Sequence, residues 1–200
     1  MTSLRSEMID IVFEISGETL PAAYPYALWD ELARLVPQFG DNEDVGVIPL
    51  RMSASKEGML IPKRAKLALR LPLSLVEAAS GLSQKRILVA GCELRLGACK
   101  TRTIQYYPTL HSHLVTGEDD ELAFMSEAAA MLARMGVEAK LICGQHHTLA
   151  DEDRSISGYS LVLHDLKPED SLRVQYAGLG KERRFGCGIF VPYKVISGLE

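Results

Sequence analysis

The chain has 200 residues, of which 47% are hydrophobic and 24% charged, and its formal net charge is −4 at neutral pH. This composition is that of an ordinary globular protein, with enough apolar residues for one large core or two small ones. No apolar run approaches the ~20 residues that span a bilayer, and Asp10 and Glu14 interrupt the apolar positions near the N-terminus, so we expect no membrane partner and a cytoplasmic location.

The first half of the chain predicts strands and helices in alternation. Residues 9–15 (IDIVFEI) carry apolar side chains at every second position, which predicts a half-buried strand. Residues 26–36 carry them at i, i+4, i+7 and i+8, which predicts an amphipathic helix that ends before Pro37. The remaining predictions are strands over 45–52 and 65–72, a short helix over 73–82, and extended segments at 87–91, 92–97 and 101–107.

The second half predicts a similar but shorter series. The order is a strand over 111–116, a helix over 118–136, and strands over 137–143 and 157–166 that are separated by a loop rich in His and Asp. We expect no second helix, because KPED is too short, and we expect SLRVQYAG (171–178) to be a strand. Two βαββαβ-type halves with a break near Pro108 indicate an α+β fold, with domains over residues 1–108 and 109–200.

Charge is distributed unevenly along the sequence. Residues 51–102 contain eleven basic and three acidic side chains, a local balance of +8, so the remainder of the chain sums to −12. A basic segment with strand-like sequence is able to form one positive face for an anionic partner. On charge alone, a well-solvated surface without a partner is the alternative.

Several short patterns do not meet the requirements of common sites. GACKT lacks the glycine that a phosphate-binding P-loop needs before its lysine, since Cys99 stands there, and GLGKER has Arg183 where a dinucleotide fingerprint has its third glycine. The four cysteines are too few for a disulfide framework, so reduced thiols are expected. Cys143, His146 and His147 leave a zinc site open as an alternative, but no second pair stands at metal-ligand spacing, so we expect no metal and no cofactor.

A glycine-rich loop near the C-terminus carries the most specific pattern. Gly178-Leu179-Gly180, five residues and Gly186-Cys187-Gly188 fit G-h-G-x5-G-h-G, where h is apolar, and IFVP follows. This loop resembles the C-terminal signature of the CRISPR-associated repeat-RNA endoribonucleases (the "Cas Six" family) of the RAMP superfamily. IDIVFEISGETLPAAYPYALWDEL looks like the N-terminus of the MYXAN-type branch, and RLPLSLVEAASGL and ELRLGACKTRTI are similar to its internal segments.

The resemblance implies tandem ferredoxin-like (RRM-like) domains that bind a CRISPR repeat hairpin and cut at its base without metal. It also implies that the protein stays on the crRNA 3′ hairpin as a subunit of an effector (Cascade-like) complex with other proteins. Glycines and cations of the loop, together with cations of the basic segment, are then candidates for contact with RNA phosphates. These candidates are Gly178, Gly180, Lys181, Arg183, Arg184, Gly186, Gly188, Lys63, Arg64, Lys66, Lys85, Arg86 and Arg102.

Catalysis without metal requires a group that takes the proton of the 2′-hydroxyl and one that protonates the leaving oxygen. The family commonly has a histidine at the start of the first helix, where this sequence has Tyr24. Because tyrosine has an ordinary pKa of about 10, it is a poor base near pH 7. The predicted catalytic group set is therefore Tyr24 with Lys100, His111 or His113, although Tyr24 as a packed aromatic and the two histidines as structural residues are alternatives.

Two further functions remain open on the sequence. One is a hairpin-binding subunit of the same complex that cuts slowly or not at all. The other is a ferredoxin-like domain that binds a metabolite and has no affinity for RNA. An RNA affinity that falls steeply with salt distinguishes the two RNA-binding functions from the metabolite-binding function.

Overall fold

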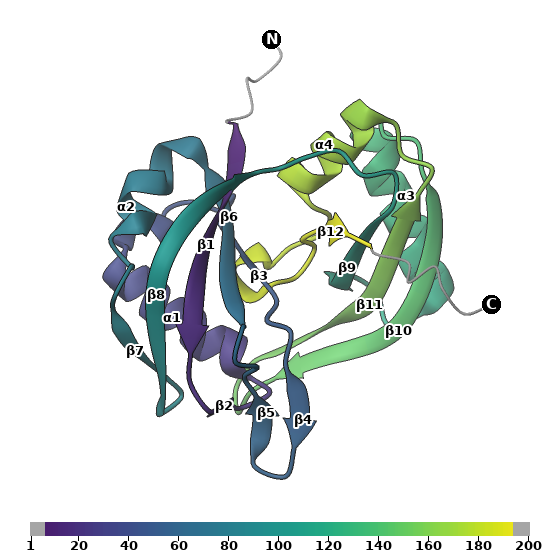
Figure 1. Cartoon of the computed structure of the whole chain (residues 1–200). Coiled ribbons are helices and arrows are strands. Elements are labelled where there is room, and N and C mark those ends of the chain that lie inside the picture. The colour runs from purple at the N-terminus through teal and green to yellow at the C-terminus, as the bar shows by residue number, and fades with distance from the viewer. Residues whose placement is uncertain (1–6, 194–200) are drawn as a thin grey trace, which may run out of the picture. The chain divides into compact units, whose positions relative to one another are not determined.

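The protein is described here by a computed structural model that covers residues 7–193 (Figure 1). The described residues form two compact units, each with its own sheet and helices. The first unit comprises residues 7–104, 149–155 and 182–186, and the second comprises residues 105–148, 156–181 and 187–193. Two short segments from the second half of the sequence therefore pack as part of the first unit.

The first unit is built on a five-stranded antiparallel sheet, whose strand order is β3-β6-β1-β8-β7. Its helices α1 (Tyr24–Leu35) and α2 (Val76–Ser80) lie behind this sheet in the view of Figure 1. The strands are β1 (Met8–Ser16), β3 (Gly46–Ile48), β6 (Lys66–Pro72), β7 (Arg86–Val89) and β8 (Cys92–Thr103). The short 3₁₀ turns are η1 (Pro37–Phe39) and η2 (Leu73–Leu75).

Alternation along β1 separates the two faces of this sheet. Ile11, Phe13 and Ile15 are buried, and the first two lie opposite Leu69 and Leu67 of β6. The side chains between them point to the other face, because successive residues of a strand alternate. The predicted strand over 9–15 and the predicted helix over 26–36 are therefore confirmed as β1 and α1.

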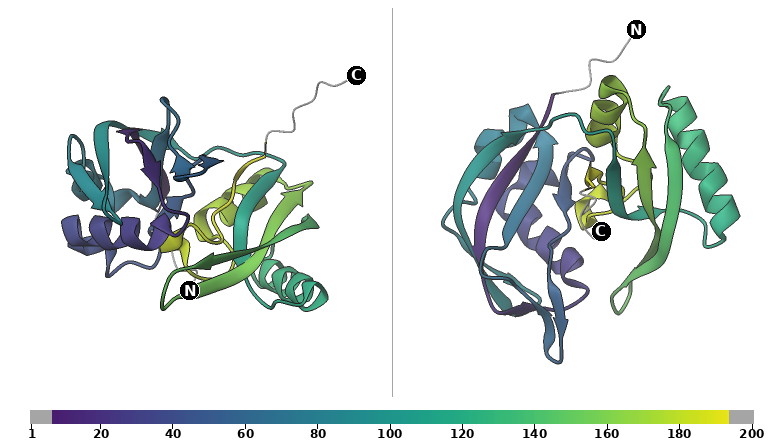
Figure 2. Two further views of the ribbon diagram at one scale, coloured as in Figure 1. Left: turned by 90° about the horizontal axis from the view of Figure 1, so that it is seen from below. Right: turned by 45° about the vertical axis from the view of Figure 1, so that its right-hand side comes forward.

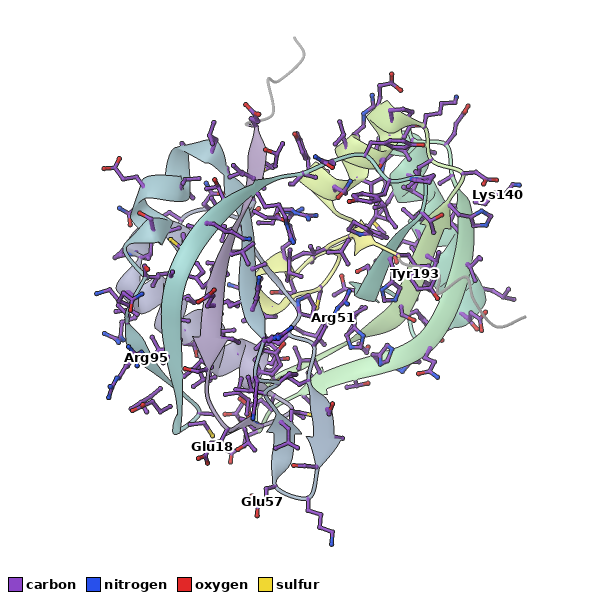
Figure 3. All side chains as sticks on the ribbon, in the orientation of Figure 1. Glu18, Arg51, Glu57, Arg95, Lys140 and Tyr193 are labelled. Atoms are coloured by element: carbon purple, nitrogen blue, oxygen red, sulfur yellow. The ribbon has the colours of Figure 1, made fainter. Side chains whose placement is uncertain are left out.

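The region between β3 and β6 differs from the prediction of one strand over 45–52. β3 ends at Ile48, because Pro49 has no N–H for the next ladder bond. The chain then forms a hairpin of β4 (Ser53–Ser55) and β5 (Gly58–Leu60), which β2 (Thr19–Leu20) completes as a separate three-stranded sheet. Glu57 lies at the tip of this hairpin (Figure 3).

The second unit has a four-stranded sheet in the order β10-β11-β9-β12. Its helices α3 (Glu121–Arg134) and α4 (Pro168–Ala177) contribute Phe124, Leu132 and Val174 to a core that also contains Leu110 and Leu161 of the sheet. The strands are β9 (Leu110–Thr116), β10 (Lys140–Ala150), β11 (Ser155–His164) and β12 (Val191–Pro192). Figure 2 shows this sheet with α3 and α4 in two further views.

The predictions of a strand over 171–178 and of no second helix are wrong, since residues 171–177 belong to α4. Pro168 fixes the backbone of the first helical turn, and Glu169 and Asp170 place negative charge at the helix N-terminus. Gly178, with φ of +67°, ends the helix. Buried residues at 170, 171, 174 and 175 follow the helical period, which outweighs the alternation of Leu172, Val174 and Tyr176.

The prediction of a polar loop between residues 143 and 157 is also wrong. β10 continues through this stretch to Ala150, and only residues 151–154 connect it to β11. His146 and His147 are therefore strand residues rather than loop residues. Within the described residues, no helix is long and apolar enough to cross a membrane.

Candidate RNA interface and candidate catalytic groups

Tyr24 is the first residue of α1, and its side chain is only 7% exposed. Its hydroxyl oxygen accepts the Leu50 N–H at 2.9 Å. Burial raises the pKa of Tyr24 to about 12, against which the Leu50 hydrogen bond is a smaller, opposing effect. The phenol therefore stays protonated at neutral pH, and its surroundings favour the role of a packed helix-entry aromatic over that of a general base.

The face of the first sheet opposite to α1 and α2, called the open face below, carries cations of the basic segment. Val12 and Ala68 on this face are nevertheless buried. Cross-strand register places Lys66 opposite Glu14, Lys100 opposite Val12 and Arg102 opposite Asp10. Arg95 lies opposite Ser16, which shares the face of Glu14, and Arg86 lies opposite Arg95 across β7 and β8, so both arginines lie there as well. These five cations are exposed: Lys66, Arg86, Arg95, Lys100 and Arg102.

A buried ion cluster lies at one end of this open face. The Asp10 carboxylate, 2% exposed, accepts hydrogen bonds from Arg70 Nε at 2.8 Å and Arg70 Nη2 at 3.2 Å. Arg70 itself is 1% exposed, whereas Arg102 reaches the same carboxylate at 3.0 Å with much of its side chain in solvent. Asp10 therefore neutralises one arginine and fixes the direction of another.

A small hollow in the same face lies between two lysines. It is lined by Val12, Glu14, Lys66, Ala98, Cys99 and Lys100. The lining combines two lysines and one glutamate with three apolar or weakly polar residues. Lys100 is thus brought together with Lys66, whereas Tyr24 is buried at the start of α1.

Other predicted cations of the first unit lie outside the strands of this face or at its edge. Lys63 and Arg64 are exposed in the turn that precedes β6, and Lys85 is exposed directly before β7. All of them are accessible, so charge is available to a partner over the open face and along its margin.

The first glycine pair of the loop is fitted closely to β9. Gly180 has φ of +73°, and a Cβ there would lie 2.6 Å from Thr116 Oγ1. The next residue, Lys181, donates its backbone N–H to that same oxygen at 2.9 Å and keeps its side chain exposed. Glycine is therefore required here by close approach as well as by backbone conformation.

The middle of the loop forms the 3₁₀ turn η3 (Arg183–Phe185), which packs on the first unit. The Phe185 ring meets the edge of Tyr26 with centroids 4.7 Å apart. Arg184 is exposed, lies over Phe185 and pairs with Glu182 at 3.0 Å. Arg183, in contrast, is 8% exposed, so the expectation that three loop cations face one partner is reduced to Lys181 and Arg184.

All five histidines of the chain lie in β9, β10 and β11 of the second unit. His113 and His147 stack with ring centroids 4.4 Å apart and an interplanar angle of 39°. His111 contacts the ring of Tyr193, which Figure 3 labels, at 5.6 Å. His146 Nε2 lies 3.1 Å from the Asp119 carboxylate, which also accepts a hydrogen bond from Ser157.

The environment of the His113–His147 pair lowers both imidazole pKa values. Desolvation lowers the pKa of His113 most, and the positive charges of His147 and His111 add to that effect. Desolvation also lowers the pKa of His147, with a smaller contribution from His146. Both rings therefore favour the neutral form at neutral pH, in which an imidazole nitrogen accepts a proton.

The zinc alternative receives no support from the geometry. Cys143 packs against the core of the second unit, and burial raises the pKa of its thiol. His146 turns to Asp119, while His147 turns to His113. Among residues 7–193 no group of three or more His, Cys, Asp or Glu side chains is placed to hold a metal ion.

Sequence reasoning did not identify His147 or Asp10 as partners of the predicted site residues. The polar residues around His147 are typical of a loop, but the segment from Cys143 to Ala150 has Gly144 as its single turn-forming residue. Asp10 stands in an alternating strand, where an acid at an outward position is usually solvated. His147 contacts His113, and Asp10 pairs with Arg70, from a different strand in each case, so the pairs become visible only when the arrangement of the strands is known.

Comparison with known proteins identifies the family. The family model described as Cas6 Crispr matches residues 9–195. The chain is 33% identical over 186 residues to the CRISPR-associated endonuclease Cas6 of Myxococcus xanthus, which covers 92% of this chain and 81% of that protein.

Solved structures show the same fold at low sequence identity. One described as "An RAMP protein binding different RNA substrates" has a TM-score of 0.69 at 12% identity and covers 93% of this chain and 100% of that chain. Thermus thermophilus Cse3 bound to an RNA representing a pre-cleavage complex has a TM-score of 0.55 at 12% identity and covers 92% of this chain and 98% of that chain. The prediction of an α+β fold with ferredoxin-like halves is confirmed, and the chain belongs to the Cas6 family.

Proposed function

We propose that the protein is a metal-independent endoribonuclease that cuts CRISPR repeat RNA and then stays on the crRNA 3′ hairpin as a subunit of an effector complex. Its family supports this function, since the Myxococcus relative is named an endonuclease and a structural neighbour was solved with an RNA representing a pre-cleavage complex. Family membership also favours an RNA partner over a metabolite.

The observation that carries RNA binding is the positive open face of the first sheet. Its exposed cations extend across β6, β8 and β7, while the residues that the register assigns to this face between 7 and 104 include no aromatic side chain. A face with cations and no stacking platform suits phosphates rather than unstacked bases. A-form RNA, whose major groove is too narrow for side chains, is mostly recognised through its shape and backbone.

Cleavage without metal uses the 2′-hydroxyl of the RNA as nucleophile. It needs a base for that hydroxyl, an acid for the 5′ oxygen, and cations for the charge on the phosphorane. Of the four predicted catalytic residues, His113 has a lowered pKa that favours the form of a base at neutral pH, and Lys100 is an exposed side chain of the open face. Tyr24, whose pKa is raised, is given a structural role, since its hydroxyl at the start of α1 accepts a hydrogen bond from the Leu50 N–H.

Incubation of the purified protein with its cognate repeat RNA in EDTA tests the proposal. The expected products are a 5′ fragment with a 2′,3′-cyclic phosphate and a 3′ fragment with a 5′-hydroxyl. RNA with a 2′-deoxy nucleotide before the cut site is the matched control, because it binds but has no nucleophile. Loss of activity in EDTA that returns with a divalent cation would contradict the metal-independent mechanism.

The second candidate function is a hairpin-binding subunit that cuts slowly or not at all. The burial of Tyr24, where the resemblance leads one to expect a catalytic histidine, favours this alternative. It predicts tight, salt-sensitive binding of an RNA that remains intact over many hours. Co-purification of the protein with a mature crRNA and further protein subunits is expected for both functions and tests membership of the complex.

A further inference from the structure

We infer that His113 and His147 are the general base and the general acid of the proposed RNA cleavage, an assignment that rests on the proposed function. Both side chains lie on the face of the second sheet that α3 and α4 do not cover. In β9, Leu110 and Val115 belong to the core that α3 and α4 share, and Ser112 lies opposite Leu161 of that core, whereas His113 is exposed and points the other way. His147 shares this face because its ring stacks on His113.

The two rings meet across an intervening strand. β11 lies between β9 and β10, so the backbones that carry the rings are two strand spacings, or about 10 Å, apart. Near this position β11 has the small residues Gly158 and Ser160, and its register with β9 shifts between Tyr159 and Leu161. A Cβ on Gly158 would clash with the Val115 carbonyl, so a larger residue does not fit at this position of β11.

Because the His113 and His147 rings lie close together, the protonation of one ring affects the protonation of the other. Two imidazolium ions with ring centroids 4.4 Å apart repel each other, so over a range of pH the pair holds a single proton. A pair with one neutral and one protonated ring contains the base and the acid that transesterification requires. His113 is the base, because neighbouring His111 and His147 both oppose its protonation, and His147 is the acid.

The proposed step conserves protons within the pair. Neutral His113 takes the proton of the 2′-hydroxyl, and the 2′ oxygen forms a bond to phosphorus. The bond between phosphorus and the 5′ oxygen breaks, its electron pair goes to that oxygen, and the His147 imidazolium protonates it. The products are a 2′,3′-cyclic phosphate and a 5′-hydroxyl, and a proton exchange with water returns the pair to its starting state.

Other ionisable groups around the pair define its pH dependence. On β9 the neighbour is His111, which contacts Tyr193, and on β10 it is His146, which is paired with Asp119 before α3. On β11 the outward-pointing ionisable residue is His164 near the end of the strand, paired with Asp165. Acids thus bind His146 and His164, while His113 and His147 face each other.

The test compares His113→Asn and His147→Asn with His164→Asn as the matched control from the same sheet. Single-turnover cleavage in EDTA is expected to slow by about 100-fold or more in the first two, with RNA affinity within about threefold of wild type. The bell-shaped pH–rate profile of the wild type should lose its acidic limb in His113→Asn and its alkaline limb in His147→Asn. Glutamine variants and thermal melts of each protein separate these effects from unfolding.

A modified substrate assigns the two roles. With sulfur in place of the 5′ bridging oxygen, the leaving thiolate needs no acid, so His147→Asn should recover activity and His113→Asn should not. If the wild type cuts and both variants cut within tenfold of its rate, the pair has no catalytic role although the proposed function stands. If the wild type binds the RNA and never cuts it, the proposed cleavage and this role of the pair are both overturned.

Discussion

Replacement of Asp10 by Asn should destabilise the first unit strongly. The change keeps the shape of the side chain but removes the negative charge that faces the buried guanidinium of Arg70. Removal of one partner from a buried ion pair costs about 3–5 kcal/mol, because the remaining charge is poorly solvated. Since the Asn oxygen can still accept one hydrogen bond, we expect a loss near the lower end, about 3 kcal/mol.

Urea unfolding followed by tryptophan fluorescence measures this loss. The chain has one tryptophan, Trp29, and it is buried in α1 of the same unit. Glu31→Gln is the matched control, since it removes the exposed pair with Arg34 on α1 and should cost about 0.5 kcal/mol or less. The double variant Asp10→Leu/Arg70→Met should recover most of the stability, because it leaves no buried charge.

A loss below 1 kcal/mol in Asp10→Asn would refute the reasoning. It would mean that Arg70 is solvated well enough in the folded state not to need the carboxylate. Failure of the double variant to exceed Asp10→Asn in stability would likewise show that packing, rather than charge, decides the cost.

Three further predictions concern RNA contacts and the start of α1. The triple change Lys66→Ala/Lys100→Ala/Arg102→Ala should weaken RNA binding and reduce the slope of log K against log salt by about 2–3. The control Arg34→Ala on α1 should leave that slope unchanged. If the triple variant and the wild type had the same slope, the open face would not be part of the RNA interface. Tyr24→Phe should cost about 1 kcal/mol of stability, because the hydrogen bond to Leu50 is lost, and should leave the cleavage rate within twofold of wild type. A tenfold slower rate at unchanged stability would implicate the hydroxyl in catalysis. Arg184→Ala should weaken RNA binding with little effect on the melting temperature, whereas Arg183→Ala should lower that temperature by several degrees, and the reverse pattern would contradict their difference in exposure.

Much of the fold could be predicted because the local signals agree with one another. In β1, alternation alone identifies the buried face, and in α1 the apolar period and the following Pro37 fix both type and end. α4 was missed because its apolar residues satisfy two periods at once, and the helix caps at Pro168 and Gly178 decide between them. KPED by itself is too short for a helix, but the helix continues beyond it to Ala177.

The candidate site could be predicted only in part, since it depends on pairing between strands. The basic composition of residues 51–102 predicts a positive surface, but register decides which cations share a face and that Arg70 is neutralised by Asp10. The glycine motif identified the loop, yet burial separates Arg183 from Lys181 and Arg184. His147 has no sequence relation to His113, and their contact arises from the order of β9, β11 and β10.

The membership of residues 149–155 and 182–186 in the first unit has a consequence for its synthesis and folding. Arg154 stacks on the Tyr26 ring at 4.3 Å, and Phe185 meets the same ring at 4.7 Å. A nascent chain that ends near residue 108 lacks both contacts. The first unit is therefore complete only after residues 149–155 and 182–186 have also been synthesised. Fragments that end near residue 108 should therefore be less stable than their share of the sheet suggests, and the first unit of the intact chain should be complete only when residues 182–186 have packed on it.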